Sequence, residues 1–392
     1  MLFDIITYLP MFITLFWAII LISTRGKEGK SKIVLGIFMS VSFLLYLSHA
    51  VYFHKIESTY IFFDPIYTFA TLAVYPIYYW YIKKLTSNDS YEFNNLNLLL
   101  PALTLSILSA ITYSLMDSGE RSHFAHQYLF DNGNIDLPST LIKIQTYIHI
   151  ATRVCFYIIT IFVFFCSKKV IRAHNERLAN YFSNINSQTI HWVNLTLTIM
   201  LSISIASLTL NTLGRTFFLE SKYTLAIPSF IFSLIYFFIG YLGYKHKNNV
   251  ENLHLSDLTQ AKHKVIADRN SDKLLSNLIS QFKNHKVYHD HELKITDLAA
   301  LLNTNRTYIS TLINQEFACS FNEYVNRYRI QEAKDLISKY PEMSLEKIAL
   351  RVGYGSLSTF FRTFKIQEGK TPNHYKQEVL SKENSMVKKQ EA

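Results

Sequence analysis

Two stretches near the carboxyl end decide the fold of this chain: ITDLAALLNTNRTYISTLINQEF at residues 295–317 and SLEKIALRVGYGSLSTFFRTF at residues 344–364. In each, apolar residues at helical spacing lie on both sides of a short polar turn, which predicts two helices packed across that turn. Asn303 and Gly353 stand in the two turns, where the backbone needs a residue that tolerates the left-handed conformation. The pattern therefore predicts two helix-turn-helix motifs in tandem.

The first motif supplies one set of candidate contact residues. Thr296 is its predicted N-cap, Ala299 is small enough for close packing of the two helices, and Asn305 begins the second helix. The apolar residues of that second helix predicted to face inward are Ile309, Leu312 and Ile313. The residues predicted to face outward are Arg306, Thr307, Ser310, Thr311 and Asn314.

The second motif repeats this arrangement. Ser344 begins its first helix, Ala349 is the small packing residue, and Ser356 begins the second helix. Phe360 and Phe364 form the predicted core face of that helix. The residues predicted to face outward are Leu357, Ser358, Phe361, Arg362 and Lys365.

A long helix is predicted between the motifs, over residues 321–340. A helix of about 20 residues is about 30 Å long. Successive major grooves on one side of DNA are about 34 Å apart, so such a spacer suits two recognition helices in adjacent grooves. One helix-turn-helix pattern is a weak signal, but two in this order with this spacer are specific. Double-stranded DNA is therefore the predicted partner.

Residues 349–375 (ALRVGYGSLSTFFRTFKIQEGKTPNHY) resemble the second helix-turn-helix of the AraC/XylS transcription regulators. Residues 320–333 (SFNEYVNRYRIQEA) resemble the connecting helix of that family, and the match covers about residues 271–377. The positions in the family's usual order are Gly353, Tyr354, Phe360, Phe364, Lys365, Gly369, Thr371, Pro372 and Tyr375.

The resemblance implies DNA-contacting roles for particular side chains. The residues it places at base- or backbone-contacting positions are Thr307, Ser310, Thr311, Leu357, Ser358, Phe361 and Arg362. Arg362 is the first candidate for base readout, as a bidentate partner of guanine. Arg306 and Lys365 are candidates for phosphate contacts. Phe361 departs from the small or polar residue usual at its position, and a thymine methyl is the contact that a phenyl ring offers.

The first 244 residues have a different character. The chain has 392 residues, 49% of them hydrophobic, and seven apolar segments precede residue 245. Segments of about 20 apolar residues are long enough to cross a bilayer. A single segment in lipid can satisfy its own backbone hydrogen bonds only as a helix. The segments predicted as transmembrane helices are residues 3–22, 33–53, 61–82, 96–116, 144–166, 190–213 and 223–244.

The distribution of basic residues predicts the orientation of these segments. One set of loops, with the residues that follow the last span, has twelve Lys and Arg near the helix ends; the opposite set has five. Basic residues concentrate on the cytoplasmic side, so the amino terminus is predicted outside and the carboxyl terminus in the cytoplasm. Seven spans have the parity that this orientation requires. The formal charge of +10, of which about +6 lies from residue 245 onward, suits a polyanionic partner or an anionic membrane surface.

Ionisable residues within the spans are the candidate ligand-binding residues of the membrane half. Arg153 lies near the middle of the fifth segment, and Asp64 in the third is its predicted partner. Two interpretations of these residues are equally favoured. They form a buried ligand site or switchable ion pair, or they form a structural pair that holds helices together. The acidic loop at residues 117–143 is either a sensing surface or, more simply, a solvated connector.

Catalytic and metal chemistry have little support. The three cysteines form no disulfide or zinc pattern, and the histidines near residues 285–291 lack regular ligand spacing. No nucleophile and base set or phosphate-binding glycine loop stands out. We therefore expect no enzyme activity, no cofactor and no metal.

Together these features predict an all-α protein: a seven-helix transmembrane bundle and a cytoplasmic domain with two helix-turn-helix motifs on a long helix. The predicted domains are a sensor at residues 1–244, a juxtamembrane linker at 245–270, an AraC-type DNA-binding domain at 271–379 and a flexible tail at 380–392. The expected function is that of a one-component transcription regulator in the bacterial inner membrane, with RNA polymerase and a second copy as further partners. Alternatives are a transporter-like protein with an attached DNA-binding module, and a sensor of a protein partner. The effector is not specified by the sequence.

Overall fold

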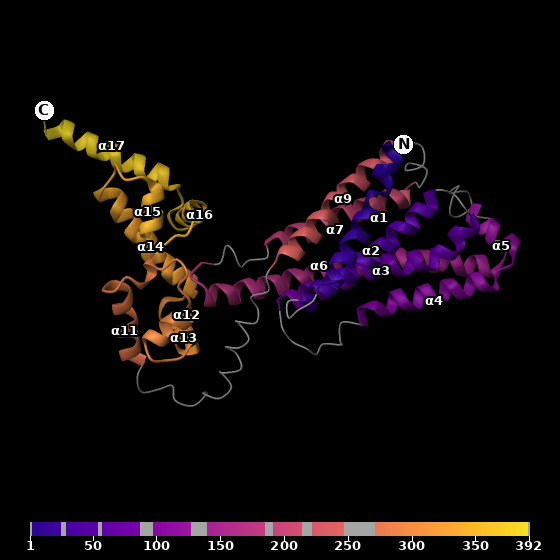
Figure 1. The fold of residues 1–392 in the computed structure, drawn as a ribbon, viewed down its shortest axis with the longest axis horizontal. Helices are drawn as coiled ribbons and strands as arrows, with labels where there is room; N and C mark the ends of the chain where they lie inside the picture. Colours follow the sequence, from indigo (N-terminus) through magenta and orange to yellow (C-terminus); the bar gives the residue numbers. More distant parts are fainter. Residues whose placement is uncertain are drawn as a thin grey trace. The chain divides into compact units, whose positions relative to one another are not determined.

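A computed structural model describes residues 2–24, 29–53, 57–86, 97–126, 139–184, 191–213, 222–246 and 271–390. Helices dominate these ranges, and apart from one isolated bridge between Phe182 and Lys294 they contain no β-structure. The all-α prediction is confirmed for this part of the chain. Contacts divide the chain into two compact units (Figure 1). Unit 1 comprises Met1–Arg172 and Ile190–Glu251, and unit 2 comprises Ala173–Thr189 and Asn252–Ala392.

Unit 1 is a bundle of long helices. Its helices are α1 (Leu2–Ile22), α2 (Gly29–Phe53), α3 (Glu57–Thr86), α4 (Leu100–Leu115), α5 (Ser118–His123), the first part of α6 (Thr140–Tyr181), α7 (His191–Leu213) and α9 (Lys222–Lys245). α2 packs against α1 and α3, α1 also packs against α9, and α3 packs against α4. Each of the seven predicted apolar segments overlaps one of these helices.

Five helices in the described ranges are long and apolar enough to cross a membrane. They lie at Ile5–Ile22, Ser31–Phe53, Asn97–Leu115, Thr140–Tyr181 and Ala226–Lys245. α3 falls outside this set, and in α7 the apolar stretch Trp192–Ala206 is shorter. The count of seven crossings therefore stays a prediction.

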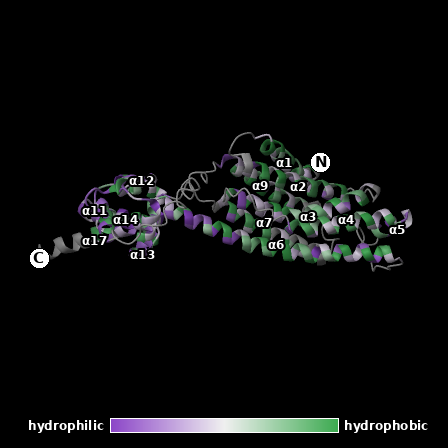
Figure 2. Cartoon of the chain, turned by 90° about the horizontal axis from the view of Figure 1, so that it is seen from below, coloured by the Kyte–Doolittle hydropathy of each residue, from purple (hydrophilic) through white to green (hydrophobic). Residues whose placement is uncertain are grey.

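Unit 1 has apolar side chains both in its interior and on its surface. Phe38, Tyr78 and Tyr81 are fully buried, and a Cβ on Gly240 would lie 2.3 Å from the Trp17 ring, so α1 and α9 approach closely there. Large apolar side chains are also exposed along the bundle, and most of the helices of unit 1 are coloured green, as hydrophobic, in Figure 2. The most exposed include Phe12, Phe62, Leu115, Ile158, Phe165, Ile227 and Phe238. An apolar exterior of this extent favours a non-aqueous surrounding.

Unit 2 consists of shorter helices with polar outer faces. They are α11 (Ser271–Lys283), the 3₁₀ turn η3 (Val287–His289), α12 (Ile295–Leu301), α13 (Arg306–Phe317), α14 (Phe321–Lys339), α15 (Leu345–Arg351), α16 (Leu357–Glu368) and α17 (Pro372–Gln390). The helix predicted over residues 321–340 is α14, whose N-cap Ser320 and Glu323 form a capping box.

α14 joins two hydrophobic cores. Its first half, with Phe321 and Tyr324, packs into a core with α11, α12 and α13, which we call the first half-domain. Its second half, with Ile330 and Ile337, packs into a core with α15 and α16, which we call the second half-domain. Because one helix supplies both cores, the spacing of the two helix pairs is fixed by its length.

Arg329 of α14 ties the two half-domains together. Its side chain is 1% exposed, and its guanidinium donates to the backbone oxygens of Tyr288 at 2.7 Å and Asp290 at 2.6 Å. The same group lies over the Tyr354 ring of the second half-domain, 5.5 Å from its centroid. Burial lowers the pKa of Arg329 to about 10, so it remains charged at neutral pH.

The carboxyl end of α6 belongs to unit 2. Leu178, Tyr181 and Phe182 are buried in the core of the first half-domain. The Ser183 amide donates to the Leu293 carbonyl at 3.1 Å, and the Asn322 side chain donates to the Ser183 carbonyl. α6 therefore contributes residues to both units, although the predicted fifth span ended at residue 166.

Several local predictions can be compared with the helix ends. Asn305, Ser344 and Ser356 are N-caps as expected. The prediction for Thr296 is wrong: the N-cap of α12 is Lys294, two residues earlier, and the Asp297 carboxylate accepts from the Lys294 amide at 2.9 Å. α17 continues to Gln390, through residues predicted as a flexible tail. Most of the predicted linker, at residues 247–270, and residues 127–138 of the acidic loop lie outside the described residues.

Candidate nucleic-acid interface

α13 presents one polar face to solvent. Its N-cap Asn305 accepts from the Tyr308 amide at 3.0 Å, and Asn303 before it has φ 50°, as a left-handed turn requires. The predicted inward residues Ile309, Leu312 and Ile313 are buried. The predicted contact residues that are exposed are Thr307, Thr311 and Asn314, and Ser310 is half-buried beside them.

Arg306, the first residue of α13, differs from these residues in its surroundings. It is half-buried, and its guanidinium lies 5.6 Å from the centroid of the Tyr181 ring at the end of α6. A cation over an aromatic face is held by about 0.5–1 kcal/mol at an exposed site. The predicted phosphate contact of the first half-domain is therefore already engaged by α6.

α16 carries the corresponding face of the second half-domain. The side chain of its N-cap Ser356 accepts from the Thr359 amide at 3.3 Å, and α16 ends at Gly369, whose φ is 72°. Phe360 and Phe364 are fully buried as predicted. The predicted contact residues that are exposed are Leu357, Ser358, Arg362 and Lys365.

Phe361 is placed partly in the core. It is half-buried and packs against the second core, with its ring 6.0 Å from Phe360 in an edge-to-face arrangement. Part of its surface is thus used for packing, which explains a large apolar residue at a position where a small or polar one is usual.

A polar hollow of about 590 Å³ lies beside Arg362. Arg327 and Asn326 of α14 and Thr359 of α16 also line it, with Ser183 and Asn184 from the residues after α6. Arg327 is exposed there and is a candidate phosphate contact that the sequence analysis did not select. In the sequence, Arg327 could have been recognised as a basic residue on the outer face of the helix predicted over residues 321–340.

One of the histidines of residues 285–291, His289, takes part in an ion-pair cluster. His289 Nε2 and Lys286 Nζ both lie 2.6 Å from carboxylate oxygens of Glu332 on α14. Burial raises the pKa of Glu332, but hydrogen bonds from Lys286, His289 and Tyr288 outweigh burial, so its pKa lies below 4.5. The described residues hold no group of three potential metal ligands.

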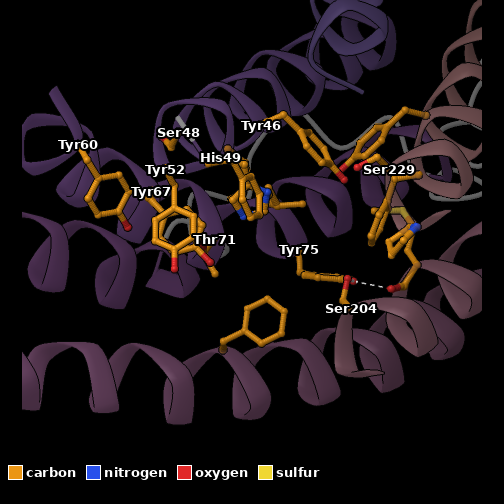
Figure 3. Close-up of a pocket in the computed structure, with 18 of the residues that line it drawn as sticks. Tyr46, Ser48, His49, Tyr52, Tyr60, Tyr67, Thr71, Tyr75, Ser204 and Ser229 are labelled. Atoms are coloured by element: carbon orange, nitrogen blue, oxygen red, sulfur yellow. Dashed lines mark hydrogen bonds between the residues drawn. The ribbon is translucent and has the colours of Figure 1, made fainter. Parts of the chain in front are cut away.

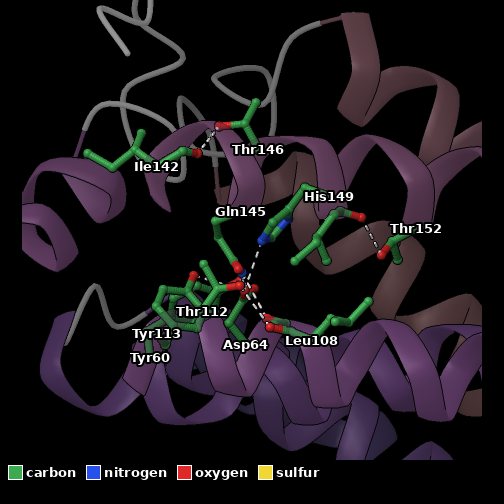
Figure 4. A network of polar contacts seen from close by, with 12 residues as sticks. Tyr60, Asp64, Leu108, Thr112, Tyr113, Ile142, Gln145, Thr146, His149 and Thr152 are labelled. Carbon is green, nitrogen blue, oxygen red and sulfur yellow. Dashed lines mark hydrogen bonds and ion pairs between the residues drawn. The ribbon is translucent and has the colours of Figure 1, made fainter. Parts of the chain in front are cut away.

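The predicted pair of Asp64 and Arg153 does not form, and that prediction is wrong. The Asp64 carboxylate is fully buried in unit 1 and has four partners, drawn in Figure 4. His149 Nε2 lies 2.8 Å away, and the other three partners are Tyr60, Tyr113 and Gln145. Arg153 follows His149 by one turn of α6, so the histidine occupies the place that the sequence analysis assigned to the arginine.

The C-terminal helices resemble those of known regulators. Residues 298–378 match the family model described as a helix-turn-helix domain. The chain is 33% identical over 122 residues to the uncharacterized HTH-type transcriptional regulator YtdP of Bacillus subtilis, an alignment of 29% of this chain and 16% of that protein. It is 32% identical over 85 residues to the raffinose operon transcriptional regulatory protein RafR of Pediococcus pentosaceus, covering 22% of this chain and 30% of RafR.

Two further proteins are similar to part of this chain. The Msm operon regulatory protein of Streptococcus mutans is 28% identical over 87 residues, which cover 22% of this chain and 31% of that protein. The solved C-terminal domain of AraT, a response regulator from Geobacillus stearothermophilus, is 26% identical and covers 28% of this chain and 86% of that domain, with a TM-score of 0.24. The chain thus spans less than a third of the length of each of these curated relatives.

Proposed function

Because residues 298–378 form an AraC-type helix-turn-helix domain, we propose that the whole chain is a membrane-embedded, one-component transcription regulator. Unit 2 binds promoter DNA, and unit 1 senses the signal that controls this binding. The observation that carries the proposal is that α6 contributes residues to both units, so a change in unit 1 has a covalent, helical route into the core of the first half-domain.

DNA reading is assigned to the outward faces of α13 and α16. Arg362 is exposed, as a bidentate contact to guanine requires, and it is the proposed base-reading residue of the second half-domain. Thr311 is the sixth residue of α13, as Arg362 is of α16, and Thr307 is exposed one turn before it. Lys365, Arg327 and Arg306 are proposed to contact phosphates, which supply affinity and register rather than sequence preference.

Embedding in the membrane is supported by unit 1 itself. Five helices are long and apolar enough to cross a bilayer, and large apolar side chains lie exposed along them. We propose seven crossings, with α3 and α7 completing the set. The distribution of basic residues near the helix ends supports an orientation with the amino terminus outside and unit 2 in the cytoplasm of a bacterium, where it can reach the chromosome.

Control of DNA binding is assigned to the end of α6. Tyr181 lies over Arg306 at the start of α13, and the residues after it hydrogen-bond to α14. A shift of α6 changes the environment of a phosphate-contacting residue and the packing of the first recognition helix together. A second copy and RNA polymerase are proposed as further partners, since two tethered modules raise each other's effective concentration on adjacent sites.

The proposal is tested by mapping DNA binding of the full chain in its host. Chromatin immunoprecipitation of the epitope-tagged, membrane-fractionated protein is expected to enrich a small set of promoters, and Arg362→Ala is expected to lose them. Lys283→Ala, which removes an exposed positive charge at the end of α11, is the matched control and is expected to keep them. The proposal fails if the wild-type chain enriches no promoter, or if the tagged protein is not in the membrane fraction.

A transporter with an attached regulatory module would show itself differently. Substrate uptake by vesicles that contain the chain, lost in a unit 1 variant, would identify it. The one-component regulator requires no such flux.

A further inference from the structure

Unit 1 contains a partly open cavity of about 220 Å³, which is lined by residues of five of the described helices (Figure 3). α2 and α3 each present one face to it, as the helical spacing of Tyr46, His49 and Tyr52 on α2 and of Tyr67 and Thr71 on α3 shows. α6, α7 and α9 complete the wall. Their lining residues are His149, Phe156, Met200, Ser204, Pro228, Ser229, Phe232 and Tyr236.

The described lining residues are mainly aromatic and include no Asp, Glu, Lys or Arg. Burying an ionised ligand among such groups would cost several kcal/mol unless a counter-charge were present. Among these described lining residues His149 forms a salt bridge, and its Nε2 is committed to Asp64. The wall therefore selects against charged ligands and favours flat, uncharged rings, which pack well against aromatic faces.

Two polar groups at the cavity have no hydrogen-bond partner among the described residues. The His49 ring contacts the rings of Tyr46, Phe53 and Tyr67, but neither of its nitrogens is hydrogen-bonded to another described residue. The Thr71 hydroxyl oxygen is buried with no hydrogen-bond partner in the same part of the chain. Figure 3 shows both among the tyrosines of α2 and α3.

Unsatisfied buried polar groups are costly, and native proteins seldom keep them without a reason. By contrast, the neighbouring phenol of Tyr75 is used: it donates to the Met200 carbonyl at 3.0 Å and lies 2.6 Å from the Ser204 hydroxyl. The imidazole offers one donor and one acceptor when neutral, and the Thr71 hydroxyl offers both. The two groups are thus available to a ligand.

We propose that this cavity binds an uncharged aromatic small molecule of about two fused rings, whose single polar group hydrogen-bonds to His49 and Thr71. An apolar cavity of about 150 Å³ accommodates benzene, so 220 Å³ suits a somewhat larger ring system. Occupancy by such a molecule is the proposed input of unit 1, and that role rests on the proposed regulatory function. Phe156 of the cavity wall belongs to α6, whose last turn lies in the first half-domain.

The test measures binding of 2-naphthol to the purified full chain in lipid nanodiscs, with empty nanodiscs as the partitioning control. Saturable binding at one site per chain is expected. Naphthalene, which lacks the hydroxyl, is expected to bind about tenfold more weakly, because one net hydrogen bond is worth about a factor of ten. The anion 2-naphthoate is expected not to bind.

Two variants locate the site. His49→Phe keeps an aromatic ring and Thr71→Val keeps the shape, so each is expected to weaken 2-naphthol binding about fivefold to tenfold and to leave naphthalene binding unchanged. Thr104→Val, on the exposed face of α4, is the matched control and is expected to bind as wild type. Ser229→Phe fills the cavity and is expected to abolish binding, and thermal unfolding of each variant shows whether the bundle is intact.

Absence of saturable 2-naphthol binding would overturn the proposal. Equal binding of naphthol and naphthalene, or no effect of His49→Phe in a folded variant, would overturn it as well, since the cavity would then be a general apolar volume filled by lipid chains. Footprinting of promoter DNA with the same nanodisc sample separates the two levels. Protected DNA without ligand binding refutes the cavity proposal alone, and ligand binding without protected DNA refutes the proposed regulatory function.

Discussion

The two half-domains of unit 2 repeat one helical plan but differ in what completes their cores. The second is built from α14, α15, α16 and α17, and its recognition helix faces outward with Arg362 exposed. The first includes Leu178, Tyr181 and Phe182 from α6, and its Arg306 is engaged by Tyr181. The two cores therefore differ in what they depend on. The described residues of the second core include none from α6, whereas the first core uses residues of a helix that also belongs to unit 1.

The largest expected effects come from removing a core ring in each half-domain. Phe360→Ala should destabilise unit 2 by about 3–5 kcal/mol, since Phe360 is fully buried. Phe182→Ala, at the edge of the first core, should cost about 2 kcal/mol. Hydrogen exchange of the full chain measures both. The comparison predicts that Phe182→Ala exposes amides of α12 and α13 and leaves α15 and α16 protected. Equal exposure of all four helices would contradict it.

Gly353 tests how independent the second half-domain is. Its φ is 93°, and an added Cβ would lie 2.3 Å from the Tyr288 carbonyl oxygen of the first half-domain. Gly353→Ala should therefore destabilise unit 2 by about 3 kcal/mol. Gly369→Ala is the matched control, because Gly369 also has a positive φ but no atom near its Cβ position; it should cost about 1 kcal/mol. Equal melting temperatures of the two variants would show that the contact with Tyr288 is unimportant.

Tyr181→Leu sharpens the comparison at the level of DNA binding, because leucine keeps an apolar side chain in the core of the first half-domain and removes the aromatic face. Loss of the ring releases Arg306, so DNA affinity of the full chain should rise about threefold, as expected for a contact of about 0.5–1 kcal/mol. Tyr340→Leu, which removes the ring beside Lys339 at the end of α14, is the control. Fluorescence anisotropy with promoter DNA gives both values, and reduced affinity of Tyr181→Leu would mean that the ring positions Arg306 rather than withholds it.

The smallest expected effect is a pH dependence specific to the first half-domain. The pKa of Glu332 is lower in the folded chain than its ordinary 4.5. Its ion pairs therefore contribute stability that is present above about pH 4.5 and lost as the pH falls through the folded pKa. Thermal unfolding between pH 3 and 7 should show this loss in the wild type and in Glu316→Gln, an exposed control. Glu332→Gln should flatten the curve, and an unchanged curve would contradict the assignment.

Features set by neighbours in sequence were predictable. Asn303, Gly353 and the N-caps Asn305, Ser344 and Ser356 depend on backbone geometry within a few residues, and the structure places each as expected. The buried residues of α13 and α16 follow from helical spacing alone.

Features that depend on residues distant in the sequence were not predictable. The choice between His149 and Arg153 as the partner of Asp64 depends on how far α6 is shifted along its axis relative to α3, because the two residues lie one turn apart on the same face of α6. The role of α6 beyond residue 172 was missed because charged residues there favoured a loop. Ile171, Leu178 and Phe182 continue the helical spacing, and that signal would have extended the helix. The Thr296 cap was wrong because Asp297 reaches back to the Lys294 amide and starts α12 earlier.

The central claim is that α6 acts on the first half-domain and leaves the second unaffected. Hydroxyl-radical footprinting of promoter DNA by the full chain in nanodiscs, wild type against Phe182→Ala, tests it most directly. We predict two protected half-sites for the wild type, and loss of protection in Phe182→Ala only at the half-site read by α13. Equal loss at both half-sites, or unchanged protection at both, would contradict the claim.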